Sequence, residues 1–252
     1  MDISLKDWTT FINRMSKLSA DATDRMLKYI RDGGGYANMD ARDVIGYATA
    51  LAQKYGEGAA TLAALMYDAI AELSGVVLPP AEVADTVTYN EMAKAMQGTA
   101  KRSLNDEVLA ALVGQYVKRA GADTTLKNAI RDGAEFAWIP HGDTCAFCIA
   151  LASRGWQRAS EKALKNGHAE HIHSNCDCMY GVRHDSKTNY IGYKPEKYEQ
   201  MYYSEEGTPK EKINAMRRKF YQQNKDEINA SKRAAYAKRK ALESSKAEET
   251  NV

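Results

Sequence analysis

Apolar side chains recur every three or four residues along most of the first half of the chain, and this spacing predicts helices that each bury one face. Ser4 is a suitable N-cap for the first helix, and the glycines at 33–35 are expected to end it. The apolar stripe of this helix consists of Leu5, Trp8, Ile12, Met15 and Leu18.

Four further helices are predicted before residue 134. Asp40 caps one that ends near Tyr55, and an alanine-rich helix follows over 57–73. The prolines of "LPP" at 78–80 break the chain, and a new helix is expected near Ala81. Asn105 then caps "DEVLAALVGQYVKRAG".

The last helix of this region is expected over "DTTLKNAIRDG", with Asp123 as its cap and Gly133 as its stop. The pattern changes at Glu135, where "EFAWIPHGD" predicts a short strand and a turn. Residues 180–203 contain six tyrosines. They predict an irregular segment, wrapped over its neighbours, that packs against the cysteine-rich region.

The C-terminal part begins with a strong helix signal. Thr208, Pro209 and Glu211 supply an N-cap, a proline in the first turn and the glutamate of a capping box. A long helix is predicted from there to about Ser244. Its apolar residues become rare after Ile228, so we expect its distal half to project or to lie on a partner.

These elements predict a mainly α fold in three parts. Residues 1–134 form a helical region, residues 135–206 form a small zinc-stapled α+β module with a tyrosine-rich wrap, and residues 207–252 form a basic C-terminal helix and tail. Hydrophobic residues make up 44% of the chain, as in an ordinary globular protein. No apolar run is long enough for a membrane span and no secretory signal is visible, so we expect a cytoplasm and reduced thiols.

The net charge of +2 is unevenly distributed. Residues 208–246 contain 12 Lys and Arg against 4 Asp and Glu, so the rest of the chain is mildly acidic. Such a basic end can bind an anionic polymer or another partner, or it can be a solvated helix. The candidate contact residues are Arg217, Arg218, Lys219, Lys232, Arg233, Lys238, Arg239 and Lys240.

All cysteines and histidines of the chain lie between residues 141 and 184. Thiolate and imidazole are the ligands that Zn²⁺ prefers, and a Cys-x-x-Cys pair can bring two sulfurs to one ion. A second ligand group must come from "HSNCDC". The candidate ligands are therefore Cys145, Cys148, His173, Cys176 and Cys178.

A structural zinc site is the favoured interpretation of this cluster. Three alternatives stay open: a reduced cluster without metal, a disulfide pair, and a catalytic metal or thiol. A zinc deaminase would carry His-x-Glu before Pro-Cys-x-x-Cys, whereas here "HAE" at 168–170 follows Cys148. No phosphate-binding loop, dinucleotide fingerprint or His-Glu-x-x-His motif is present.

"TCAFCIALASRGW" followed by "HIHSNCDC" resembles the Mu F-like family of phage minor head proteins. The match to the ending includes His173, Asn175, Cys176 and Cys178, and the match to the front includes Cys145, Cys148 and Gly155. "RDGAEFAWIP" also resembles the segment that precedes the motif. The resemblance covers about residues 123–184.

The resemblance implies a non-enzymatic minor capsid protein that joins the head near the portal and acts in head morphogenesis, DNA packaging or ejection. Its partners would be the portal protein, other capsid proteins and double-stranded DNA, in the virion or, during assembly, in the host cytoplasm. A zinc role is carried onto the cysteines and the histidine, which are five candidates for four places. His168 and His171 are additions to the pattern.

Two other functions are compatible with these residues. One is a zinc-dependent nucleic-acid enzyme, such as a nuclease that uses His168, Glu170 and His171. The other is a cellular zinc protein that binds DNA or RNA.

Overall fold

The computed structural model describes residues 2–142, 144–161, 176–226, 229–230 and 233. It divides into two compact units, Met1–Glu199 and Gln200–Val252. The described part is mainly α-helical with a few short strands, which confirms the predicted fold class. None of the described helices is long and apolar enough to cross a membrane.

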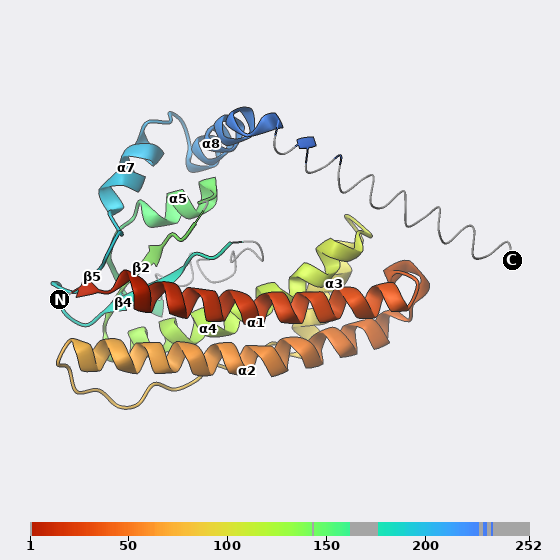
Figure 1. Ribbon diagram of the computed structural model, residues 1–252, viewed down its shortest axis with the longest axis horizontal. Helices are drawn as coiled ribbons and strands as arrows, with labels where there is room; N and C mark the ends of the chain where they lie inside the picture. The colour runs from red at the N-terminus through yellow and green to blue at the C-terminus, as the bar shows by residue number, and fades with distance from the viewer. Residues whose placement is uncertain (1, 143, 162–175, 227–228, 231–232, 234–252) are drawn as a thin grey trace, which may run out of the picture. The chain divides into compact units, whose positions relative to one another are not determined.

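Three long helices form most of the first unit: α1 (Leu5–Asp32), α2 (Ala41–Leu73) and α4 (Asp106–Asp132). They lie side by side in Figure 1 and pack on one another along their lengths. The predicted caps are confirmed, because the side chains of Ser4, Asp40 and Asn105 each accept a hydrogen bond from a first-turn backbone N–H. The predicted stop at Gly133 is confirmed by its left-handed backbone, with φ of 63°.

The sequence predicted two helices in each of the spans that α2 and α4 occupy, and both predictions are wrong. Their glycines lie inside continuous helices, where they permit close packing. A Cβ atom on Gly56 would lie 3.3 Å from the Thr86 side chain. One on Gly121 would lie 2.6 Å from the Met15 side chain. The packing of neighbouring segments, rather than a chain break, accounts for these glycines.

The helix predicted near Ala81 is absent, since residues 76–88 form neither helix nor strand. This segment instead bonds to the helices beneath it. The Ala81 N–H donates to Asp68, and the backbone of Glu82 exchanges hydrogen bonds with the Asn128 side chain. Helix α3 (Tyr89–Ala100) begins afterwards with a capping box. Partners far away in sequence therefore override the helix signal of the prolines.

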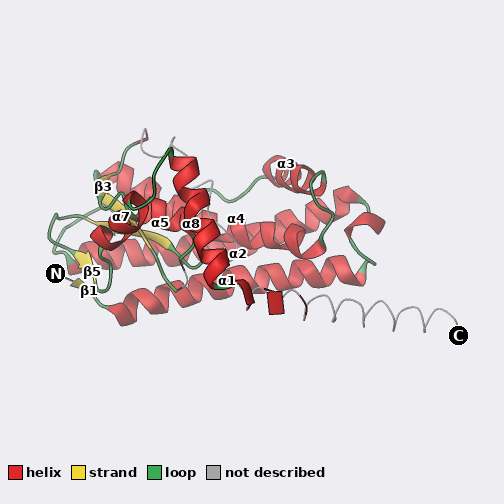
Figure 2. Cartoon of the chain, turned by 90° about the horizontal axis from the view of Figure 1, so that it is seen from above, coloured by secondary structure: helices red, strands yellow, loops and turns green. Residues whose placement is uncertain are grey.

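A three-stranded antiparallel sheet, ordered β3-β2-β4, packs against α4 and α5. Figure 2 shows it at one end of the long helices. β2 (Glu135–Ile139) is the strand predicted from "EFAWI". Its partners are β3 (Gln157–Arg158) and β4 (Met179–Arg183), and the short helix α5 (Ala146–Ala152) lies between β2 and β3 in sequence.

The tyrosine-rich segment is more regular than predicted, because it begins with the buried strand β4. Further along, β5 (Asn189–Tyr190) pairs in parallel with β1 (Asp2–Ile3) at the start of the chain. The Tyr190 hydroxyl donates to the Val182 carbonyl and accepts from the Val182 N–H. These tyrosines pack on the sheet, as the sequence predicted.

The sheet and the long helices share one buried core, which includes residues from α1, α4, β2 and β4. The first two parts predicted from the sequence, 1–134 and 135–206, therefore meet across a common interior within Met1–Glu199. The boundary at 134 marks a change of sequence pattern inside this unit.

The second unit contains the end of α7 (Pro195–Tyr203) and α8 (Pro209–Gln223). The predicted capping box of Thr208 and Glu211 is confirmed, with Pro209 in the first turn. Lys219 forms an ion pair with Glu205, and the Lys212 ammonium lies over the Tyr203 ring. α8 ends at Gln223 with Asn224 as its C-cap. Most of the longer helix predicted to Ser244 lies outside the described residues.

The closest approach of α1 and α4 predicts a strong effect of one substitution. In Gly114→Ala, the new Cβ would lie 2.7 Å from the Ser19 hydroxyl and 2.9 Å from the Ser19 carbonyl oxygen. We expect a loss of about 1–3 kcal/mol in the free energy of unfolding, measured by denaturant titration. The control is Gly46→Ala in α2, which has no atom within 4 Å of the new Cβ. It should be stabilising by up to about 1 kcal/mol, and an equal loss in both variants would contradict the packing argument.

Candidate metal centre

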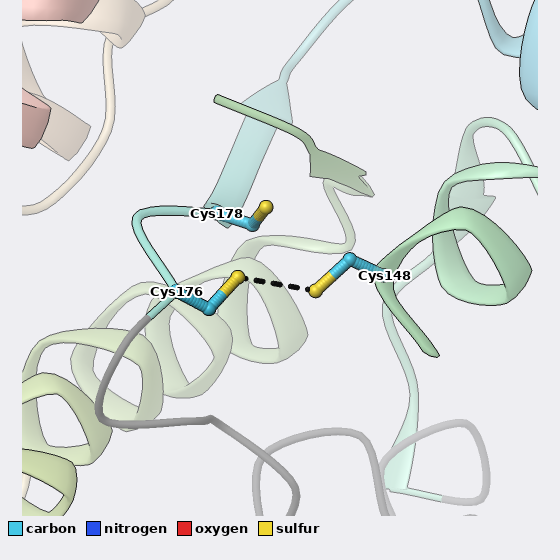
Figure 3. Close-up of side chains that lie close together, drawn as sticks. All are labelled: Cys148, Cys176 and Cys178. Carbon is cyan, nitrogen blue, oxygen red and sulfur yellow. Dashed lines mark hydrogen bonds between the residues drawn. The ribbon is translucent and has the colours of Figure 1, made fainter. Parts of the chain in front are cut away.

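Three cysteines from separate segments converge inside the first unit. The sulfur atoms of Cys148, Cys176 and Cys178 all lie within 4.8 Å of one another. The Cys148 and Cys176 sulfurs, drawn in Figure 3, are 3.2 Å apart. All four cysteines of the chain are free, so the predicted alternative of a disulfide pair is absent from this structure.

The sulfur spacing suits a tetrahedral metal ion. A Zn–S bond of about 2.3 Å places two thiolates about 3.8 Å apart in a tetrahedron, and the observed spacings bracket that value. Exposed fractions of 1% for Cys148, 6% for Cys176 and 0% for Cys178 leave these thiols shielded from water. The cluster is therefore a candidate site for a metal ion, held by residues that the sequence predicted as ligands.

The local fold brings each sulfur into place. Cys145 is the N-cap residue of α5, so Cys148 lies within the first turn of that buried helix. Cys178 directly precedes β4, which pairs with β2 through Met179 and Ile139. First and third residues of an extended segment share one face, which is consistent with Cys176 and Cys178 both facing Cys148.

The three thiols influence one another's protonation. Hydrogen bonds from Cys148 and Cys176, together with the His141 backbone N–H, lower the pKa of Cys178 to about 4. Interactions with Cys145 and Cys148 also lower the pKa of Cys176. The same contacts raise the pKa of Cys148, which keeps its proton in the metal-free chain. Two sulfurs are thus prepared as anions, and a metal ion would displace the proton of the third.

The residue between the two ligand cysteines, Asp177, bonds to the helices. Its carboxylate accepts hydrogen bonds from the Ser16 hydroxyl in α1 and from the Lys118 ammonium in α4. Burial alone would raise the pKa of the Asp177 carboxyl, but these two partners hold it below its usual value. Lys118 also donates to the Cys176 carbonyl oxygen over 2.7 Å. The Cys-x-Cys segment is therefore fixed from its helix side.

Aromatic side chains enclose the strands next to the cluster. Tyr180 packs edge-on against Trp138, its cross-strand partner, with ring centroids 4.7 Å apart. The Tyr193 hydroxyl donates to the Ala152 carbonyl at the end of α5. This packing keeps α5 and β4 together and so maintains the spacing of Cys148 and Cys178.

The other predicted ligands differ in what the structure describes. Cys145 is half-buried, and its thiol forms hydrogen bonds with Cys148 and Cys176. His173 lies outside the described residues, as do His168 and His171. The fourth ligand of a tetrahedral site is therefore unassigned by the described coordinates alone.

The basic contact residues predicted near the C-terminus are only partly described. Arg217 and Arg218 are exposed on α8, where Lys219 is paired with Glu205. Arg233 is described as an exposed helical residue. The remaining predicted contacts, Lys232, Lys238, Arg239 and Lys240, lie outside the described residues.

Sequence reasoning missed the residues that support the cluster, Lys118, Asp177 and Ser16. Lys118 belongs to "YVKRAG", where it looked like an ordinary solvated helix residue. One available signal was its position among apolar and small residues of α4, which are buried on most sides. Its partner is more than fifty residues away, and no local pattern identifies such a pair.

Removal of one thiol tests the geometry directly. We expect Cys148→Ser, Cys176→Ser and Cys178→Ser each to weaken Co²⁺ binding and to reduce the thiolate-to-cobalt charge-transfer absorption, because each removes one sulfur ligand. Titration of the reduced chain with Co²⁺, followed by ultraviolet absorption, measures this. Thr144→Ser is the control, since its hydroxyl bonds to the Gly142 carbonyl. Spectra unchanged by all three cysteine substitutions would contradict a shared site.

The family model described as VG15 protein matches residues 2–205. The matched span contains the long helices, the sheet and all four cysteines, and it ends before the basic helix α8. No curated protein and no solved structure matches the chain. The viral origin that the sequence implied is supported at the level of this family. The chain belongs to the VG15 protein family, a family of phage or viral gene products.

Proposed function

We propose that the protein is a non-enzymatic minor component of a phage head, in which a single Zn²⁺ bound by the cysteine cluster staples the strand region to the helices. The observation that carries this proposal is the convergence of three buried sulfurs from α5 and from the segment before β4. Membership of a viral family and the resemblance to Mu F-like minor head proteins support the role in the head.

Cys148, Cys176 and Cys178 would hold the ion, and Cys145 is the best supported fourth ligand. Its thiol already bonds to two of the three others. Zinc in such a site has no redox chemistry and contributes folding energy, on the order of 10 kcal/mol in small zinc modules. The short strands and the seven-residue helix α5 form a small region that benefits from such a crosslink.

A structural role for the ion follows from its surroundings. A catalytic zinc keeps one open position that water and substrate can reach, whereas the three converging thiols are buried. We therefore propose no hydrolytic or deaminase activity for the protein. The site would act by holding the fold of a head component that binds the portal and other capsid proteins.

Zinc content tests the first half of the proposal. We expect protein purified under reducing conditions to contain about one equivalent of zinc per chain, because four thiolates saturate one tetrahedral ion. Elemental analysis by mass spectrometry measures this. A content below about 0.2 equivalents, after incubation with zinc and removal of the excess, would reject the structural zinc site.

The basic helix α8 provides a test of the assembly role. Arg217 and Arg218 are exposed beside Phe220, which is 50% exposed. We propose that this surface and the basic residues after it contact DNA or the portal. Phosphate contacts require charge but no sequence-specific geometry, so any DNA affinity should fall by about a factor of ten or more between about 50 and 200 mM salt.

A chain truncated after Gly207 should keep its zinc and lose DNA affinity, portal affinity or both, as measured by binding titrations with each partner. In the full chain, Arg217→Ala with Arg218→Ala should weaken the same binding, whereas lysines at both positions should preserve it, since they keep the charge. If the truncated protein binds both partners as the full chain does and still supports head assembly, α8 is only a solvated helix.

A further inference from the structure

Lys118 is a charged side chain in the interior of the first unit. It lies in the middle of α4, and its side chain is only 3% exposed. Burial of an ammonium group is unfavourable unless hydrogen bonds and opposite charge compensate for the lost water. A lysine is retained at such a position only where its contacts offset this penalty, and its contacts lead to the metal ligands.

The Lys118 ammonium binds two consecutive residues of the Cys-x-Cys segment. It donates to the carbonyl oxygen of Cys176 over 2.7 Å and to the Asp177 carboxylate over 3.2 Å. Both contacts lie on the side of the segment away from the sulfurs, and Ser16 of α1 bonds to the same carboxylate oxygen. Two helices therefore fix the segment through its main chain and its middle side chain.

This attachment determines where the two sulfurs lie. With the Asp177 side chain directed to the helices, the side chains on either side of it are available to face Cys148, as Figure 3 shows for Cys176. The segment has no strand partner until Met179. In the described part of the chain, the hydrogen bonds to Lys118 and Asp177 hold these two residues before pairing in β4 begins.

Charge gives the lysine a second effect. Three thiolates and one Zn²⁺ carry a net charge of −1, and a fourth thiolate makes it −2. In a buried site this charge is poorly screened by water. A fixed ammonium group hydrogen-bonded to a ligand residue stabilises the anionic, metal-bound form.

We propose that Lys118 is a positioning residue for the metal site, which anchors the Cys-x-Cys ligands to the helical bundle and offsets their charge. This inference rests on the proposed zinc site. It implies that metal affinity and the stability of the helices are coupled, because the residue that orders the ligands belongs to α4.

The test is the substitution Lys118→Met in the full chain, which removes the ammonium group and keeps a long side chain. We expect Zn²⁺ affinity, measured by competition with a chromophoric chelator, to fall about 10- to 100-fold, as for other residues that orient metal ligands. The stabilisation that Zn²⁺ gives against thermal unfolding, relative to the chelator-treated protein, should shrink in parallel.

The matched control is Asn128→Ala, which removes another buried polar side chain of α4. Asn128 holds the backbone at Glu82 and has no printed contact with the cysteine segment. This variant should lose stability equally with and without zinc and keep its Zn²⁺ affinity. A lysine with a merely structural role would give the same pattern as this control.

The outcomes separate the two proposals. If the wild-type chain binds no zinc, the proposed site fails and the role of Lys118 fails with it. If the wild type binds zinc and Lys118→Met binds it within about twofold as tightly, only the inference on Lys118 is overturned. Should Lys118→Met not fold, Asp177→Ala and Ser16→Ala decide in its place. Both should weaken Zn²⁺ binding severalfold, and unchanged affinity in both would overturn the inference.

Discussion

The hydrogen bond from Lys118 to the Cys176 carbonyl joins the two halves of the first unit at the point where the sulfurs meet. On one side of this bond lie the long helices, whose close packing keeps the lysine away from water. On the other side lies a short segment of chain that leads to β4 and carries two cysteines. The bond requires a buried cation, and the bundle supplies the surroundings in which such a cation is strongly directed toward its acceptors.

The close packing of the helices is what makes this arrangement possible. Gly114 and Gly121 lie on α4 within two turns of Lys118, and each allows another helix to approach its backbone. Glycine inside a helix costs up to about 1 kcal/mol relative to alanine. Here that loss is offset by contact area between α1, α2 and α4, which brings Ser16 and Lys118 to the same carboxylate.

A small sheet and a seven-residue helix have limited apolar surface of their own, and the described structure compensates in two ways. Tyrosines and tryptophans cover the strands, and polar anchors connect the cysteine segment to the bundle. A metal ion among the thiols would add a third link between α5 and β4. For a protein that must keep its shape within an assembly, such crosslinks restrict the motion of a surface without requiring any chemistry at the site.

Local patterns in the sequence determined the helix caps at Ser4, Asp40, Asn105 and Thr208, the stop at Gly133, the strand from Glu135 and the identity of the metal-binding thiols. These features depend on residues within a few positions of one another, so short-range physics suffices. Tertiary structure alone decided that glycines at 56 and 121 continue helices, that residues 76–88 stay extended, and that Lys118 supports the thiols. In each of these cases the deciding partner is distant in the chain, and its contact energy exceeds the local preference.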